Sequence, residues 1–323
     1  MKCLEPVLVG YSFGRKANGD VRFVGVKGCR PELVDDRLFI FGKEASPIYV
    51  GCGKCPFCVK AKKRDITTRI VHEARNSEAA WFVTLTYNPT HLPSDGSLVK
   101  RDVQLFLKRL RKARPNDHIR YMLVGEYGKL HLRPHYHMIL FGLPDMPLVF
   151  HECRCKYDVY RSPLIERCWT LGFSTLTRFD YSNARYVAQY CQKKADIQDL
   201  PSGLERPFML GSRGKCGEGA IGAPWFDRWH TEMLRDGFCV LRVNGHSFKV
   251  PLPRYYLRRA RERYHEEWLK LVLSREEYLM SHFEELPTSE DYAEYLASLE
   301  SEARTITKQE SDSLSNRRYE NDN

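Results

Sequence analysis

Strand-like and helix-like patterns alternate between residues 81 and 194, and this order constrains the fold more than any other feature of the sequence. Residues 81–87 (WFVTLTY) alternate apolar and polar side chains, as a half-buried strand does, and residues 101–113 carry apolar side chains along one helical face. The later segments are expected to be strands at 119–125, 135–142 and 172–180 and helices at 164–169 and 182–194. This order predicts an α+β fold, close to a ferredoxin-like antiparallel sheet of four to five strands with its helices packed on one face.

The flanking sequence predicts three further parts. Residues 1–78 are expected to hold short strands, a Cys-rich basic segment and a helix marked by the four-residue spacing of Ile66, Ile70 and Ala74. Residues 79–235 form the expected core, and residues 236–285 are read as a basic helical extension. Residues 286–323 are expected to be an acidic, disordered tail, because residues 281–323 hold 4 basic and 11 acidic side chains.

The balance of charge favours a nucleic-acid partner. The chain has 51 Lys and Arg against 41 Asp and Glu, and the acidic end makes the rest more basic than the average. At 42% hydrophobic residues it can bury a core, which excludes a disordered or fibrous chain. We expect no membrane span and no secretory signal, hence a cytoplasmic protein. The 11 cysteines are odd in number and clustered, which fits reduced thiols better than disulfides.

A metal site is predicted from three side chains. His135 and His137 are two residues apart on an expected strand, so both project from the same face. Glu126 ends the preceding strand and can supply a carboxylate as a third ligand. Two imidazoles and a carboxylate leave positions open for substrate oxygens, which suits Mg²⁺ or Mn²⁺, although histidines also accept Zn²⁺. Taken singly, these residues are equally typical of satisfied or surface positions.

A pair of tyrosines is the candidate nucleophile. Tyr186 and Tyr190 are four residues apart and share a helical face, with Lys193 and Lys194 following them. A phenol has a pKa near 10 and attacks poorly until nearby cations lower that value. An isolated pair at this spacing is more often core packing, so the lysines carry the argument.

Together these segments resemble a known family. TLTYNP, GEYG, RPHYHMILFG and YVAQYCQKK follow one another between residues 84 and 194 and are similar to the successive motifs of HUH endonucleases, the rolling-circle replication initiators. The resemblance is closer to the initiators of gokushovirus-type microviruses, which share the upstream CGKCPFC and the KRLRK of the helix, and it spans residues 50–230. A departure lies at residues 211–226 (GSRGKCGEGAIGAPWF), where the family has a shorter turn.

The resemblance implies a reaction and its partners. In such a protein one tyrosine attacks the scissile phosphate near the ion, which gives a 5′-phosphotyrosyl DNA link and a free 3′-OH, and the strand is rejoined at termination. The implied partners are single-stranded or melted origin DNA, a host helicase and a host DNA polymerase. No nucleotide cofactor is expected, because GSRGKC lacks the spacing of a phosphate-binding loop. The sequence leaves the oligomeric state open.

A second metal site is expected at Cys52, Cys55 and Cys58. Their Cys-x-x-Cys-x-x-Cys spacing matches a zinc knuckle, and the sequence offers Cys29 or His72 as the fourth ligand of a structural Zn²⁺. Free thiols or an iron–sulfur cluster are the alternatives.

Basic side chains near this knuckle and in the C-terminal region are candidate DNA contacts. They are Lys54, Lys62, Lys63, Arg64, Arg258 and Arg259. A solvated basic helix face is an equally good reading of the last two. Two other functions fit the sequence, namely a non-enzymatic zinc-knuckle nucleic-acid-binding protein and a related HUH transposase or relaxase.

Overall fold

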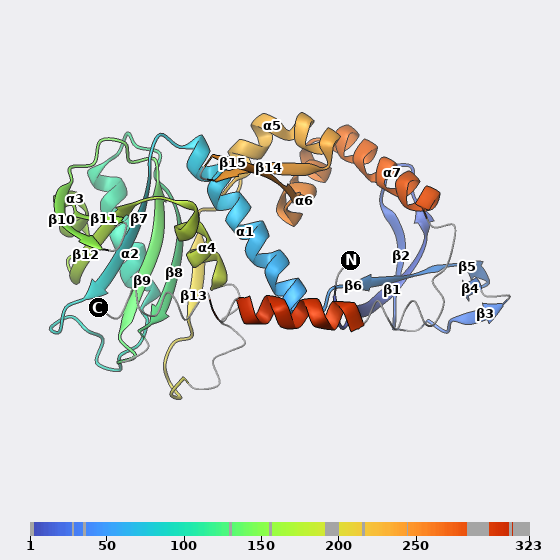
Figure 1. The fold of residues 1–323 in the computed structure, drawn as a ribbon, viewed down its shortest axis with the longest axis horizontal. Coiled ribbons are helices and arrows are strands. Elements are labelled where there is room, and N and C mark those ends of the chain that lie inside the picture. Colours follow the sequence, from blue (N-terminus) through green and yellow to red (C-terminus); the bar gives the residue numbers. More distant parts are fainter. Residues whose placement is uncertain are drawn as a thin grey trace. The chain divides into compact units, whose positions relative to one another are not determined.

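The computed structural model describes residues 3–27, 29–34, 37–128, 131–154, 157–190, 200–214, 217–243, 245–282, 297–309 and 312. The chain divides into two compact units, and the ribbon in Figure 1 follows their elements along the chain. The first unit consists of Met1–Ala61, Leu234–Gly237 and Leu257–Asn323, and the second of Lys62–Met233 and Phe238–Tyr256. Both units draw on separate stretches of the chain, whereas the sequence predicted four consecutive segments, and that division into domains stays a prediction.

The second unit is built on a seven-stranded antiparallel sheet. In spatial order its strands are β10 (Val149–Arg154), β11 (Tyr157–Arg161), β12 (Gly172–Arg178), β7 (Ala80–Tyr87), β9 (Pro134–Phe141), β8 (Arg120–Tyr127) and β13 (Phe208–Gly211). The four strands predicted from the sequence are the adjacent strands β12, β7, β9 and β8. The α+β class with antiparallel sheets is confirmed. The extra strands β10 and β11 were missed because their side chains are mostly exposed and lack the alternation that marks a half-buried strand.

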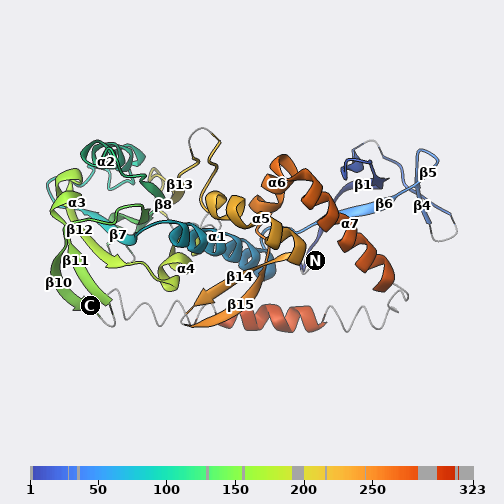
Figure 2. The ribbon, with the colours of Figure 1, turned by 90° about the horizontal axis from the view of Figure 1, so that it is seen from above.

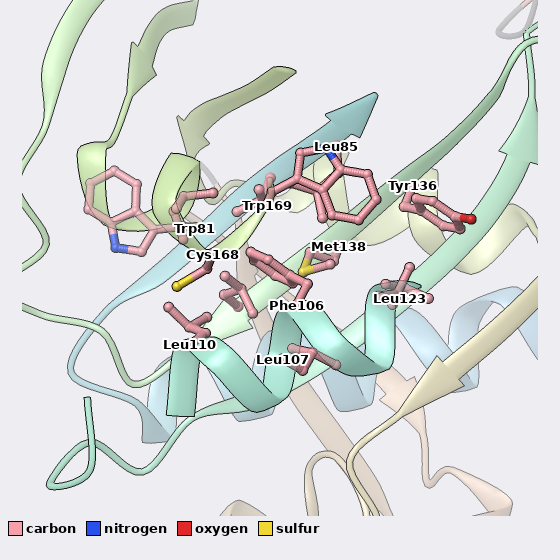
Figure 3. Packing of buried hydrophobic residues seen from close by; sticks show 14 of the residues in the cluster. Trp81, Leu85, Phe106, Leu107, Leu110, Leu123, Tyr136, Met138, Cys168 and Trp169 are labelled. Atoms are coloured by element: carbon pink, nitrogen blue, oxygen red, sulfur yellow. The ribbon is translucent and has the colours of Figure 1, made fainter. Parts of the chain in front are cut away.

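One face of the sheet packs against α2 (Lys100–Ala113) and α3 (Pro163–Cys168). Trp81 and Leu85 of β7 are buried there against the apolar stripe of α2, which includes Phe106 and Leu110 (Figure 3). This burial follows from the two periods read in the sequence, every second residue on β7 and every third or fourth on α2. The main core of the second unit therefore lies on this face.

The other face of the sheet carries α4 (Tyr181–Gln189). Figure 2 shows α2 on one side of β7 and β8 and α4 on the other, and α4 contacts β8 and β9. The prediction that the helices share one face was wrong. Side chains alternate along β9, so Tyr136 and Met138 belong to the α2 side while His137 faces α4, through its contact with Tyr186. Periodicity places residues on two faces but does not say which helix covers each.

A capping box fixes where α4 begins. Asp180 accepts a hydrogen bond from the Asn183 backbone N–H, and the Asn183 side chain accepts one from the Asp180 N–H. The helix was expected to run to residue 194. It is described to Gln189, with Tyr190 as its C-cap, and residues 191–199 lie outside the described part of the chain.

A long helix and a hairpin complete the second unit. Helix α1 (Pro56–Asn76) confirms the helical pattern of the Cys-rich segment, and its buried Glu73 pairs with Arg120 of β8. Glu73 also accepts a hydrogen bond from the Gly222 backbone N–H, ahead of α5 (Ala223–Asp236). The expected helical extension at 236–285 instead begins with a hairpin of β14 (Phe238–Val243) and β15 (His246–Pro251).

The first unit holds two small antiparallel sheets and several helices. Its strands are β1 (Val7–Arg15), β2 (Val21–Gly25) and β6 (Ser46–Val50) in one sheet, and β3 (Glu32–Val34), β4 (Arg37–Ile40) and β5 (Lys43–Glu44) in the other. Helices α6 (Arg254–Arg263) and α7 (His265–His282) follow the hairpin. In the described residues no helix is long and apolar enough to cross a membrane.

The predicted disordered tail requires a correction. Residues 297–309 are helical, and Leu299, Ala303 and Ile306 are buried against Phe57. Their spacing of four and three residues gives the segment an apolar stripe, which its acidic composition concealed. The remaining residues after 309, apart from residue 312, lie outside the description.

Candidate metal centre and nucleophile

The three predicted metal ligands come together at one point of the sheet. Strands β8 and β9 pair so that Glu126 lies opposite His135, while His137 is on the same face two residues further along β9. Oε1 of Glu126 is 3.2 Å from Nε2 of His135 and 2.9 Å from Nε2 of His137. One atom from each residue lies within 4.8 Å of the others. The donor set, two imidazoles and a carboxylate, fits a divalent cation.

Both imidazoles are oriented through their other ring nitrogen. Nδ1 of His135 is 3.1 Å from the backbone oxygen of Arg133. A carbonyl oxygen only accepts, so Nδ1 carries the hydrogen and the neutral ring presents the Nε2 lone pair toward Glu126. Nδ1 of His137 is 3.0 Å from Oγ1 of Thr84 on β7. The ring of His137 also stacks on Phe82, with centroids 5.5 Å apart.

The environment of Glu126 keeps its carboxylate charged. The residue is 4% exposed, and burial by itself raises the pKa of the carboxyl group. The hydrogen bonds and charges of His135 and His137 outweigh that effect and hold the pKa of Glu126 well below its usual range. A buried carboxylate is therefore available as an anionic ligand.

Both candidate tyrosines reach this centre from α4. The hydroxyl of Tyr186 donates a hydrogen bond to Oε1 of Glu126, the oxygen that faces both histidines. The hydroxyl of Tyr190 lies 3.2 Å from that of Tyr186 and donates to it. Tyr186 also packs edge-on against His137, with ring centroids 5.1 Å apart. The tyrosines are thus placed in series, with Tyr186 beside the expected ligands and Tyr190 behind it.

The remaining predicted site residues are scattered. Lys193 and Lys194 lie outside the described residues. Lys54, Lys62 and Arg258 are exposed, and Lys63 and Arg64 are half-buried. Arg259 is only 7% exposed, which leaves Arg258 as the accessible member of that pair.

Two residues of the site face were missed by the sequence reasoning. Thr84 was read only as part of a strand, and its contact with His137 depends on the pairing of β7 with β9. Phe173 of β12 is 59% exposed, and it pairs with Thr86, which in turn pairs with His135. Paired residues of neighbouring strands share a face, so Phe173 is an exposed aromatic side chain in the same row as the histidine. No local signal in the sequence indicates that row.

The cysteine cluster has a different fourth member from the one expected. Cys52, Cys55 and Cys58 meet Cys3. The prediction of Cys29 or His72 was wrong, because Cys29 donates to the backbone oxygen of Gly25 and His72 is buried beside the hydroxyl of Tyr256.

Comparison with known proteins points to phage replication. The family model of replication-associated proteins of the ORF2 type matches residues 80–195, a stretch that contains the expected ligands and both tyrosines. Among curated proteins, the chain is 29% identical to replication-associated protein VP4 of Bdellovibrio phage phiMH2K over 84% of this chain and 80% of that relative. It is 26% identical to replication-associated protein ORF2 of Spiroplasma virus 4 over 95% and 97%.

A third relative is replication-associated protein ORF4 of Chlamydia phage 1, at 30% identity over 64% of this chain and 52% of that protein. No solved structure gives a significant match. The chain therefore resembles the replication-associated proteins of small phages along most of its length.

Proposed function

We propose that this chain, which resembles microvirus replication initiators, starts rolling-circle replication by nicking origin DNA with a tyrosine hydroxyl. The substrate is single-stranded or locally melted DNA. The enzyme is a metal-dependent, site-specific endonuclease that also rejoins the strand when a round ends.

The observation that carries this proposal is the position of the Tyr186 hydroxyl. It bonds to the oxygen of Glu126 that also faces His135 and His137. A phosphate that occupied this point would meet the nucleophile and the ligand set together, which is the proximity that covalent catalysis requires. A pair of tyrosines kept for packing alone does not need a hydroxyl at the ligands.

The proposed step is a phosphoryl transfer from DNA to the protein. The Tyr186 oxygen forms a bond to the scissile phosphorus, and its proton passes to an acceptor, for which Glu126 already accepts the hydrogen bond. The bond from phosphorus to the 3′ oxygen breaks, and that oxygen leaves as a 3′-OH after taking a proton from solvent. The product is a 5′-phosphotyrosyl link, which preserves the energy of the bond for rejoining without a nucleotide cofactor.

Mg²⁺ or Mn²⁺ is the proposed ion at Glu126, His135 and His137. When bound, such an ion supplies charge that polarises a phosphate oxygen. The protein's part is to fix the two imidazoles through Thr84 and the Arg133 carbonyl and to keep Glu126 ionised.

Tyr190 is proposed as the second nucleophile. Its hydroxyl is 3.2 Å from that of Tyr186, so a small shift of the helix end or of the DNA exchanges the two at the same phosphate. One tyrosine can hold the old 5′ end while the other cleaves the regenerated origin.

The strand order supports an HUH core of ferredoxin-like type. The predicted strands lie in the order β12, β7, β9, β8, so the last and first strands along the chain are neighbours and the first strand pairs with the third. This arrangement is that of a split βαβ unit, with α2 as the crossover between β7 and β8.

Contacts to DNA are proposed at two kinds of residue. Lys54, Lys62, Lys63, Arg64 and Arg258 are the proposed phosphate contacts. The exposed ring of Phe173 is proposed to stack on a base next to the scissile phosphate. A host helicase and a host polymerase would then open and extend the nicked strand.

The deciding experiment is adduct formation. The protein is incubated with Mn²⁺ and labelled oligonucleotides that tile its own genome, and the products are run on a denaturing gel. We expect one origin sequence to give a shifted band that protease removes, with the label retained only when it lies on the 3′ side of the nick. Binding without an adduct for every oligonucleotide would refute the endonuclease and favour a non-enzymatic nucleic-acid-binding protein. Cleavage at insertion-type ends alone would favour a transposase.

A further inference from the structure

Four thiols converge in the first unit, and none of them takes part in the proposed reaction. The sulfur of Cys3 is 3.8 Å from that of Cys55 and 3.7 Å from that of Cys58. The four sulfurs of Cys3, Cys52, Cys55 and Cys58 lie within 4.8 Å of one another. A disulfide requires about 2.0 Å, so these thiols are not paired with each other.

The spacing of the sulfurs matches one particular coordination geometry. Zinc binds thiolate sulfur at about 2.3 Å in a tetrahedral site, and the edges of such a tetrahedron are about 3.8 Å long. The separations of Cys3 from Cys55 and Cys58 equal that edge. A multinuclear iron–sulfur cluster has to be surrounded and holds its sulfurs farther apart.

Strand pairing brings Cys3 to the knuckle. Val7 of β1 pairs with Val50 of β6 in antiparallel fashion, so the residues before Val7 run alongside those after Val50. Cys3 and Cys52 therefore meet although they are far apart in the sequence, and the Cys52 backbone N–H donates to the Cys3 sulfur at 3.3 Å. A search for short motifs cannot detect this ligand.

The loop between the first two knuckle cysteines is shaped around a charged sulfur. The backbone N–H groups of Lys54 and Cys55 donate to the sulfur of Cys52 at 3.4 and 3.3 Å. Gly53 permits the turn with a φ of 78°, a value that residues with a side chain rarely adopt. Backbone donors aimed at sulfur stabilise a thiolate and orient it for a metal.

We infer that Cys3, Cys52, Cys55 and Cys58 bind one structural Zn²⁺ ion. Four protein ligands close the coordination sphere and leave no position for a substrate, so the ion acts on folding and not on the reaction. The inference is independent of the nuclease proposal.

The site sits next to an apolar cluster that it would hold in place. Cys55 and Leu4 pack on the cluster of Phe57 and the buried stripe of residues 297–309. Cys58 lies in the first turn of α1. The ion would thereby tie together the N-terminal segment, the start of α1 and the C-terminal helix, and its binding free energy would add to the stability of this unit.

The test uses the full chain purified without chelator from medium that contains zinc. We expect about one Zn²⁺ per chain by elemental analysis in the wild type and in Cys29→Ser, the matched control from the same unit. Cys3→Ser should lose most of the zinc, and Cys3→His should retain it, because histidine is also a zinc ligand. The melting temperature should fall for Cys3→Ser and on chelation, and zinc should restore it after chelation.

A separate measurement guards against a Cys3→Ser variant that does not fold. Cobalt exchanged into the wild type should give the strong sulfur-to-metal absorption of a four-thiolate site. Iron in place of zinc, or no metal in the wild type after growth with zinc, would overturn the inference. Full zinc in a folded Cys3→Ser together with its loss in Cys29→Ser would show that the fourth ligand is wrongly assigned.

Discussion

The hydroxyl of Tyr186 donates a hydrogen bond to Oε1 of Glu126, and this contact joins a helix to a strand across the open face of the sheet. The same oxygen faces Nε2 of both histidines, so the nucleophile is attached to the ligand set before any substrate arrives. The order in which Tyr186 and Tyr190 approach Glu126 makes them unequal, although their sequence spacing treats them alike.

The tyrosines should therefore differ in the first cleavage. We expect Tyr186→Phe to lose the larger part of single cleavage, by about tenfold or more, while Tyr190→Phe retains most of it. The double variant should form no covalent adduct, and both single variants should fail in repeated cleavage and rejoining. Tyr181→Phe is the control, because Tyr181 packs on Phe248 instead of on the ligands. An adduct formed by the double variant would disprove the assignment.

Loss of either histidine should separate chemistry from binding. His135→Ala or His137→Ala should abolish nicking, yet DNA affinity measured by fluorescence anisotropy should stay close to wild type, because phosphate contacts elsewhere supply most of it. His246→Ala, at an exposed position of β15, is the matched control. Nicking at the wild-type rate by either variant would exclude the metal centre.

Thr84 should affect the metal more than the fold. Thr84→Val removes the oxygen 3.0 Å from Nδ1 of His137 and leaves a side chain of similar size. Changes of this kind cost about 10- to 100-fold in metal affinity, so the Mn²⁺ concentration for half-maximal nicking should rise by that factor. Thr175→Val, at the paired position on β12, should leave it unchanged. Equal shifts in both variants would mean a general effect on the sheet.

Phe173 should contribute to substrate binding. Stacking on a base is worth about 1 to 3 kcal/mol, so Phe173→Ala should raise KM for a single-stranded origin by about 5- to 100-fold with little change in kcat. Phe173→Tyr should restore binding. The control is Phe150→Ala, since Phe150 is equally exposed but pairs with Tyr160, which lies on the α2 side. An unchanged KM would rule out this role without affecting the nuclease assignment.

His72 should make stability depend on pH. Burial, followed by the nearby charge of Arg75, lowers the pKa of His72 to about 3, whereas an unfolded histidine titrates near 6.5. Below that pH the unfolded chain binds the extra proton, so the stabilisation present above about pH 6.5 is lost as pH falls, by at most about 1.4 kcal/mol per pH unit. His72→Phe should flatten the curve of unfolding free energy between pH 6.5 and 5. Parallel curves for the two proteins would contradict a neutral buried histidine.

The sequence by itself determined the central elements and most of the candidate site. Strict alternation in residues 81–87 and the apolar stripe of residues 101–113 are local properties, and burial of one face follows from them directly. His135, His137, Glu126 and the two tyrosines were found because their spacing along a strand or a helix already fixes which side chains share a face.

Only the tertiary structure decided which separate segments meet. The pairing of β1 with β6 selected Cys3 as the fourth thiol, and the pairing of β7 with β9 and β12 brought Thr84 and Phe173 to the site face. Packing of α4 against β8 and β9 placed Tyr186 before Tyr190 at Glu126. These contacts join residues far apart in the chain. Their formation depends on strand register and on which face a helix covers, and neither quantity is encoded in the periodicity of a single segment.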